Sequence, residues 1–172
     1  MPTLGKDAMG AALDSWAAHI AETCTARDNR LAIIGLISHG DTLAQRLIQR
    51  LEARGVHALY GALDISLYRD DFDMKQNKPA LRSSYLPFST DGLHLILVDD
   101  VVQTGRTVRA ALNAIFEYGR PTSVQLHCLV DRAGRELPIC PDYSAFRISA
   151  PADAKVAVHL QETDGCDEII HP

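Results

Sequence analysis

Two adjacent carboxylates stand directly before a segment that is typical of a phosphate-binding turn. Asp99 and Asp100 follow the apolar run 93–98 and precede Thr104–Thr107, which reads Thr-Gly-Arg-Thr. A glycine and hydroxyl side chains at the start of a helix favour a phosphate, because free backbone N–H groups and the helix dipole attract the anion. Carboxylates beside a phosphate repel it unless they have another task, such as hydrogen-bonding the vicinal hydroxyls of a ribose. The segment therefore predicts a site for a ribose 5-phosphate.

The same residues have a simpler interpretation, in which the two aspartates form a turn and a threonine caps a helix. Short motifs of this kind often occur by chance. Here a buried apolar strand precedes the pair and a helix follows it, which is the context that a phosphate site requires. We therefore favour the ribose-phosphate interpretation.

The elements around this motif are typical of an open α/β sheet, whose ligands bind beyond the carboxyl ends of the strands. Short apolar runs alternate with helical periodicity, which predicts a mostly parallel central sheet with helices on both faces. We expect the second helix to end at Gly55 and the third at Gly119, because glycine commonly terminates helices. The expected strands cover 31–37, 57–68, 93–98, 123–130 and 155–160, and the expected helices carry the apolar positions 9–24, 43–51 and 108–116.

Two segments differ in composition from the rest of the chain. Segment 69–92 is polar, contains Pro79 and Pro87 and lacks periodicity, which is unusual in a compact domain unless the loop is a functional lid. Segment 161–172 carries four carboxylates and no lysine or arginine, so we expect an acidic tail. The length of 172 residues predicts one domain over 1–172.

Charge, cysteine content and hydropathy weigh against several classes of protein. A formal net charge of −5 weighs against non-specific nucleic-acid binding, which depends on surplus lysine and arginine. The four cysteines are scattered, without a C-x-x-C pair or a histidine at the spacing of a zinc motif, and we expect reduced thiols in a cytoplasmic protein. No apolar stretch approaches the roughly 20 residues of a membrane span, so membrane insertion is not expected.

The stretch Leu95–Thr107 resembles the phosphoribosyl-pyrophosphate signature of type I phosphoribosyltransferases. Three further stretches, 63–71, 118–121 and 129–139, are similar to the PyrR family, which combines pyrimidine operon regulation with uracil phosphoribosyltransferase activity. The resemblance runs from the first expected helix to the last expected strand. Four blocks in the same order are hard to obtain by chance.

This resemblance implies a type I phosphoribosyltransferase fold in which segment 69–92 forms a flexible hood loop. It implies transfer of the phosphoribosyl group from phosphoribosyl pyrophosphate to uracil, giving UMP and pyrophosphate. It also implies Mg²⁺ as cofactor, held mainly through substrate oxygens and not directly by protein ligands. The residues it implies as catalytic are Asp99, Asp100 and Arg69, and those it implies as substrate-binding are Ser38, His39, Gly40, Val101, Val102, Gln103, Thr104, Gly105, Arg106, Thr107 and Arg132.

The chain departs from the family pattern in three places, one of which is Gln103, where the family often has an aromatic residue. The family's first loop has basic residues for pyrophosphate, whereas this chain has Ile37 in place of a lysine and His39 in place of an arginine. These replacements remove charge-assisted contacts to pyrophosphate, which are the strong ones. An alternative function is therefore a nucleotide-sensing pyrimidine regulator with little or no turnover. After Tyr143 the family's base-lining Gly-Lys-x-Ile-Pro-Thr run is missing, which leaves open a phosphoribosyltransferase for another base.

The sequence leaves more than one possibility for the macromolecular partner. Arg46, Arg50 and Arg54 lie four residues apart and form one basic stripe on the second expected helix. Such a stripe can bind the phosphates of pyrimidine leader RNA, although a solvated helix face is the simpler interpretation and the one we favour. The resemblance further implies a homodimer or higher homo-oligomer, and the regulated target can be RNA or another protein.

Overall fold

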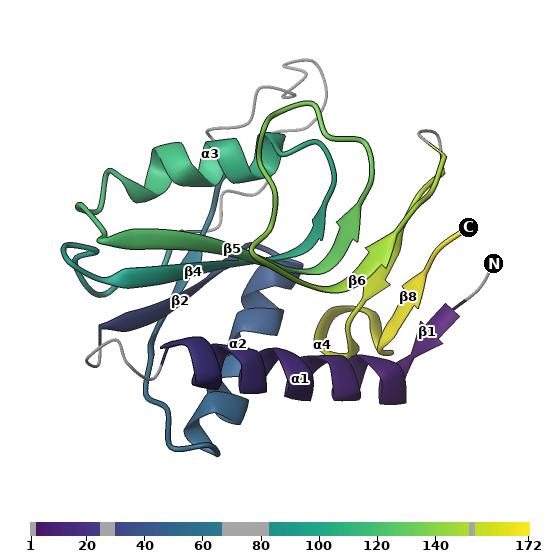
Figure 1. The fold of residues 1–172 in the computed structure, drawn as a ribbon, viewed down its shortest axis with the longest axis horizontal. Helices are drawn as coiled ribbons and strands as arrows, with labels where there is room; N and C mark the ends of the chain where they lie inside the picture. Colours follow the sequence, from purple (N-terminus) through teal and green to yellow (C-terminus); the bar gives the residue numbers. More distant parts are fainter. Residues whose placement is uncertain (1–2, 25–29, 67–82, 152–153) are drawn as a thin grey trace.

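The computed structural model describes residues 3–24, 30–66, 83–151 and 154–172, and its centre is a five-stranded parallel sheet (Figure 1). The strand order is β3-β2-β4-β5-β6. The strands are β2 (Leu31–Leu36), β3 (Leu59–Leu63), β4 (His94–Val102), β5 (Ser123–Arg132) and β6 (Tyr143–Ile148). The predicted fold class, a parallel α/β sheet with helices on both faces, is confirmed.

Helices cover both faces of this sheet because its central strands are apolar on both sides. In β2, Ile33 packs with helices α1 (Lys6–Cys24) and α2 (His39–Glu52), whereas Ile34 packs with helix α3 (Arg106–Ile115) on the opposite face. Figure 1 shows α3 on one side of the sheet and α1 and α2 on the other. Strand side chains alternate between faces, so a continuous apolar run such as β2 fills both cores at once.

The helices follow the predicted apolar faces, with differences at their ends. The five expected core positions of α1 are all buried, namely Met9, Leu13, Trp16, Ile20 and Cys24. Helix α2 ends at Glu52, three residues before the expected Gly55, which follows in a turn with φ of +74°. Helix α3 ends at Ile115, and Phe116 is 56% exposed, so its predicted place on the buried face is wrong.

The strands differ more from the sequence expectation. Strand β3 covers five residues of the expected 57–68, and beyond it the Asp64 side chain accepts a hydrogen bond from the Ser66 backbone N–H (2.8 Å). Strand β4 continues four residues past Val98, because Asp99 pairs with Cys128 and the ladder with β5 extends to Val102. Strand β6 was not predicted, since its sequence of Tyr-Ser-Ala-Phe-Arg-Ile carries no clear apolar alternation.

A second, three-stranded antiparallel sheet joins the two ends of the chain. It contains β1 (Thr3–Gly5), β8 (Glu168–Ile170) and β7 (Ala157–His159), in that order. The strand expected over 155–160 is therefore neither the last strand nor part of the main sheet. The expected acidic tail 161–172 instead holds the short helix α4 (Gln161–Asp164) and β8, and Figure 1 shows the N- and C-terminal strands side by side.

Two further findings concern the cysteines and the possibility of a membrane span. All four cysteines, Cys24, Cys128, Cys140 and Cys166, are free thiols, as expected. Within the described residues, no helix is both long enough and apolar enough to span a membrane.

Candidate functional site

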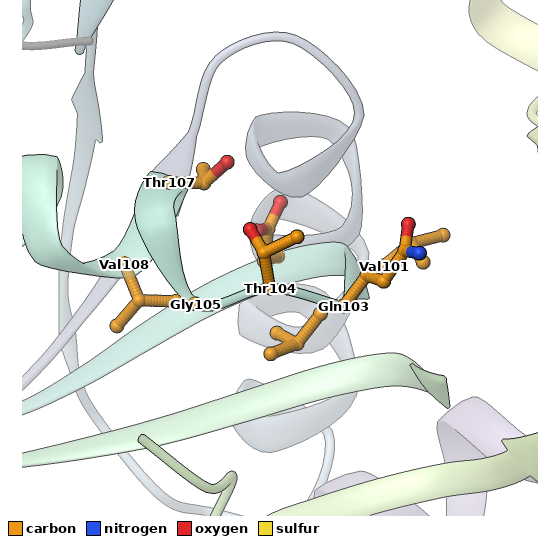
Figure 2. A pocket seen from close by; sticks show the side chains of 8 residues that line it. Val101, Gln103, Thr104, Gly105, Thr107 and Val108 are labelled. Atoms are coloured by element: carbon orange, nitrogen blue, oxygen red, sulfur yellow. The ribbon is translucent and has the colours of Figure 1, made fainter. Parts of the chain in front are cut away.

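A cavity of about 320 Å³ lies at the turn between β4 and α3, where the sequence predicts the ribose 5-phosphate site (Figure 2). Gly105 adopts a left-handed conformation with φ of +90°, which lets the chain pass directly from the strand into α3. The N-terminal backbone of α3 therefore faces the same turn as the carboxyl end of β4. The lining residues are Asp99, Val101, Val102, Gln103, Thr104, Gly105, Thr107 and Val108.

The two predicted aspartates take different positions at this strand end. Asp99 is 6% exposed, lines the cavity and accepts a hydrogen bond from the Asp100 backbone N–H (3.0 Å). The Asp100 carboxylate accepts the Val101 backbone N–H (2.9 Å) and lies 3.2 Å from Nδ1 of His39. Burial opposes ionisation of Asp100, but hydrogen bonds involving His39 and Asp99 dominate and lower its pKa. Asp100 is therefore a carboxylate that is already partnered by the first loop.

His39 begins helix α2 and bridges two carboxylates. Its Nδ1 lies 3.2 Å from Asp100, and its Nε2 lies 3.4 Å from Asp164 at the end of α4. The hydrogen bond to Asp100 is the largest of the effects that raise the pKa of His39, and Asp164 adds to it, against the opposing effect of burial. Both contacts favour the imidazolium form. Asp164 is a site residue that the sequence did not predict, because nothing in the spacing of an acidic segment shows where it folds back.

Two glycines bring the start of α2 against the sheet. A Cβ at Gly40 would lie 2.3 Å from the Val98 carbonyl oxygen, and a Cβ at Gly35 would lie 2.4 Å from the Asp41 Cα. Side chains at these positions would push α2 away from β2 and β4, so glycine is required by packing. Ser38 is exposed, and the Ile37–Ser38 peptide bond is cis. The predicted residues Ser38, His39 and Gly40 thus lie together at the carboxyl ends of the strands.

The predicted arginines Arg106 and Arg132 do not line this cavity. The Arg106 side chain is about half exposed and pairs with Glu136 (2.7 Å). Arg132 is buried and donates to the Gln103 side-chain oxygen (2.9 Å), so it contacts the cavity lining without forming part of it. Arg69 lies outside the described residues, as does most of the expected hood loop 69–92. Within the described part of that segment, Tyr85 forms an antiparallel bridge with Ala62 of β3.

A second cavity, of about 280 Å³, lies at the carboxyl ends of β5 and β6. Arg132 links the two cavities, because it lines this one and donates to Gln103 of the first. Arg135 also connects them, since it donates to the Val102 carbonyl oxygen (3.1 Å) and binds Asp131. The sequence did not single out Arg135 as a site residue. The lining residues are Asp131, Arg132, Ala133, Gly134, Arg135, Arg147, Ile148 and Ser149.

The three arginines of the basic stripe on α2 are partnered by groups of the same chain. Arg46 binds Asp167 (2.7 Å) and Glu162, which come from the acidic C-terminal segment. Arg50 pairs with the Asp14 carboxylate (3.0 Å), and Arg54 donates to the Asp14 carbonyl oxygen (3.2 Å). The carboxylates of the expected tail therefore neutralise part of the stripe, which supports the simpler of the two interpretations.

Comparisons with known proteins agree with this geometry. The profile of the family described as "Phosphoribosyl transferase domain" matches residues 4–162. The chain is 55% identical to the "Bifunctional protein PyrR" of Akkermansia muciniphila over 142 residues, which cover 83% of this chain and 80% of the relative. It is 46% identical to the protein of the same name from Deinococcus radiodurans, over 95% of this chain and 90% of the relative.

Solved structures show the same fold at lower sequence identity. The hypoxanthine phosphoribosyltransferase of Trypanosoma cruzi superposes with a TM-score of 0.72 at 20% identity. The match covers 98% of this chain and 94% of that one. A likeness at this identity shows the architecture of the sheet and its helices but carries no information about the base.

Proposed function

The chain belongs to the PyrR family of phosphoribosyltransferase-domain proteins, and from this premise we propose that it converts uracil and phosphoribosyl pyrophosphate to UMP and pyrophosphate. We propose that it also acts in the regulation of pyrimidine genes. The observation that supports the enzymatic activity is the cavity between β4 and α3. Its lining includes both the Asp99 carboxylate and the start of a helix.

In this proposal the 5′-phosphate binds at Thr104–Thr107, where the start of α3 and the hydroxyls of Thr104 and Thr107 line the cavity. The Arg106 backbone N–H donates to the Thr104 hydroxyl oxygen (3.2 Å), and a bound phosphate would replace that oxygen as its acceptor. Asp99 and Asp100 hold the ribose hydroxyls. The reaction needs no protein nucleophile, because its transition state resembles an oxocarbenium ion whose charge develops on the sugar. The protein contributes by positioning the sugar, the base and the leaving group.

The cavity suits a substrate that arrives with Mg²⁺. Its described lining includes one carboxylate, that of Asp99, and no basic side chain, so the lining itself does not balance the charge of a pyrophosphate. We propose that Mg²⁺ is held mainly through oxygens of the substrate, which are the hard ligands that it prefers. When bound, the ion supplies positive charge to the leaving pyrophosphate. Asp99 and Asp100 orient the ribose that carries those oxygens.

The variant Asp100→Asn tests the role of the strand-end carboxylates. We expect loss of UMP formation and weaker binding of phosphoribosyl pyrophosphate, with an unchanged circular dichroism spectrum, because the amide keeps the shape but not the charge. Asp14→Asn on α1 is the matched control, since Asp14 is an exposed carboxylate away from the cavity. Full activity of Asp100→Asn would show that the motif has another role.

A second candidate function is a nucleotide-sensing pyrimidine regulator that binds the same ligands with little turnover. The observation that favours it is the first loop, where Ile37 is apolar and His39 is already paired with Asp100 and Asp164. If this loop limits catalysis, the double variant Ile37→Lys/His39→Arg raises the turnover rate, because it adds fixed positive charge for the pyrophosphate. An unchanged rate would remove that explanation. A phosphoribosyltransferase for another base is distinguished by offering alternative bases in the same assay.

For the regulatory role we propose pyrimidine leader RNA as the partner. The arginines of α2 engage carboxylates and carbonyl groups of the same chain, so RNA binding there would compete with Glu162, Asp167 and Asp14. A gel-shift assay with a salt titration tests the partner, because each phosphate contact steepens the loss of affinity with salt. No shift with leader RNA would favour a protein target. We further propose that the protein is cytoplasmic and that it forms a homodimer or higher homo-oligomer. Light scattering measures the oligomeric state.

A further inference from the structure

Three side chains that commonly bind transition metals converge on the hairpin that joins β7 to β8. They are His159 at the end of β7, Cys166 in the connecting turn and Glu168 at the start of β8. Each offers one ligand atom, and the three atoms lie within 4.8 Å of one another. Cys166 is exposed and the other two residues are half-buried, so the cluster is open to solvent.

The backbone explains why these residues meet. His159 and Glu168 are direct partners in the antiparallel ladder, and the His159 Nδ1 lies 2.9 Å from a Glu168 carboxylate oxygen. Cys166 precedes Glu168 by two residues, and its Sγ lies 3.6 Å from the same oxygen. The sequence did not indicate a zinc motif, because six residues separate His159 from Cys166 and only the hairpin brings them together.

The simpler interpretation is a metal-free group in which His159 pairs with Glu168 and the Cys166 thiol donates a weak hydrogen bond to the same carboxylate. A tetrahedral zinc ion with bond lengths of about 2.0–2.3 Å holds its ligand atoms about 3.3–3.8 Å apart. Two of the three separations, 2.9 and 3.6 Å, are already close to this range. The third separation, between the His159 nitrogen and the Cys166 sulfur, is at most 4.8 Å.

The electrostatic surroundings also suit a cation. The carboxylates of Glu168, Asp164 and Asp167 lie near the Cys166 thiol. Asp164 and Asp167 are already paired with His39 and Arg46, so Glu168 is the carboxylate that attracts a positive ion. One nitrogen, one sulfur and one oxygen ligand form a borderline-soft set that suits Zn²⁺ better than Mg²⁺ or Ca²⁺.

We propose that His159, Cys166 and Glu168 bind one Zn²⁺ ion, with water as the fourth ligand. The Cys166 proton is released to solvent when the sulfur binds the ion, so thiolate and carboxylate together balance its charge. The segment between the ligands carries Asp164 and Asp167, which contact His39 and Arg46 respectively. The ion would therefore fix the turn that holds Asp164 against the first loop of the candidate site.

Titration of the metal-free full chain with Co²⁺ tests this proposal, because cobalt bound to a thiolate absorbs in the near ultraviolet. We expect one equivalent to bind with this absorption and Zn²⁺ to displace it. Cys166→Ser removes the sulfur ligand and should weaken binding more than ~10-fold, the lower end of the loss seen even for partners that only orient a ligand. His159→Gln should weaken binding similarly, with unchanged circular dichroism in the absence of metal.

Cys140→Ser is the matched control, because Cys140 is the other exposed thiol of the chain. We expect this variant to bind Co²⁺ as the unchanged protein does. In a second readout, Zn²⁺ should raise the melting temperature of the unchanged protein and of Cys140→Ser, but not that of Cys166→Ser. The absence of saturable binding, or equal binding by Cys166→Ser and Cys140→Ser, would overturn the proposal.

Discussion

His127 lies in the middle of β5 and is expected to make the protein sensitive to mild acid. Its side chain is 1% exposed, and its Nδ1 accepts a hydrogen bond from Nε1 of Trp16 (2.9 Å). An Nδ1 that accepts a hydrogen bond carries no proton, so the ring is neutral. Burial, followed by the nearby His19, lowers the pKa of His127 to about 3. The native state therefore resists the proton that an unfolded chain would take up.

The sign of the effect follows from the two pKa values. An exposed histidine in the unfolded chain has a pKa of about 6.5. Below that pH, His127 of the unfolded chain binds a proton, whereas His127 of the native chain stays neutral until the pH approaches 3. The free energy of unfolding therefore falls as the pH falls, by up to about 1.4 kcal/mol per pH unit. Between pH 7.5 and pH 5 the expected loss from this one residue is about 2 kcal/mol.

The variant His127→Asn isolates this contribution. Its amide oxygen can accept the Trp16 hydrogen bond, but the amide does not titrate. Urea unfolding at pH 7.5, 6.5, 5.5 and 5.0 measures the free energy of unfolding of both proteins. The free-energy gap between them should change by about 2 kcal/mol over this range, with the variant favoured at low pH. His39, whose raised pKa acts in the opposite direction, is common to both proteins and cancels in the gap.

The exposed histidine His57 provides the control, and His57→Asn should follow the pH profile of the unchanged protein. Parallel profiles for His127→Asn and the unchanged protein would refute the reasoning, because they would mean that His127 takes up its proton equally in the folded and unfolded chains. A constant offset in stability would not change that conclusion. Only the dependence on pH reports the titration.

Other perturbations act on the first loop and on α2. Arg46→Met leaves the half-buried Asp167 with the Gln161 backbone N–H but without its cationic partner, so urea unfolding should show a loss of about 2 kcal/mol. The exposed pair of Arg50 should contribute less than about 1 kcal/mol. Gly40→Ala places a methyl group against the sheet and should weaken binding of phosphoribosyl pyrophosphate in calorimetry, whereas Gly10→Ala on α1 has free space and should not. Asp164→Asn should lower the pKa of His39 in an NMR titration, because it removes one of two carboxylates; an unmoved pKa would contradict the bridge.

Patterns that repeat along the chain made the core of the fold predictable. The apolar run of β2 and the helical spacing from Met9 to Cys24 each indicate a buried face, and both are buried. The link from β4 through Gly105 to α3 was predictable for the same reason, since an apolar strand and an amphipathic helix flank it. The position of the candidate cavity follows from that link.

Features that depend on distant contacts were not predictable. Strands β1 and β8 have three residues each, too few to show alternation, and they form only because the ends of the chain meet. Strand β4 continues through two aspartates, which strands usually avoid, because β5 offers a ladder partner. The contact of Asp164 with His39 joins residues 125 positions apart in a turn that carries no periodic signal.

Formation of UMP by the purified protein is the measurement that bears most directly on the proposed activity. Labelled uracil, phosphoribosyl pyrophosphate and Mg²⁺ are supplied, UMP is quantified, and calorimetry measures binding of UMP and phosphoribosyl pyrophosphate in parallel. We expect Mg²⁺-dependent UMP formation that is faster with uracil than with cytosine, hypoxanthine or guanine. Binding of both ligands without measurable UMP from uracil would contradict the enzymatic proposal and favour the nucleotide sensor.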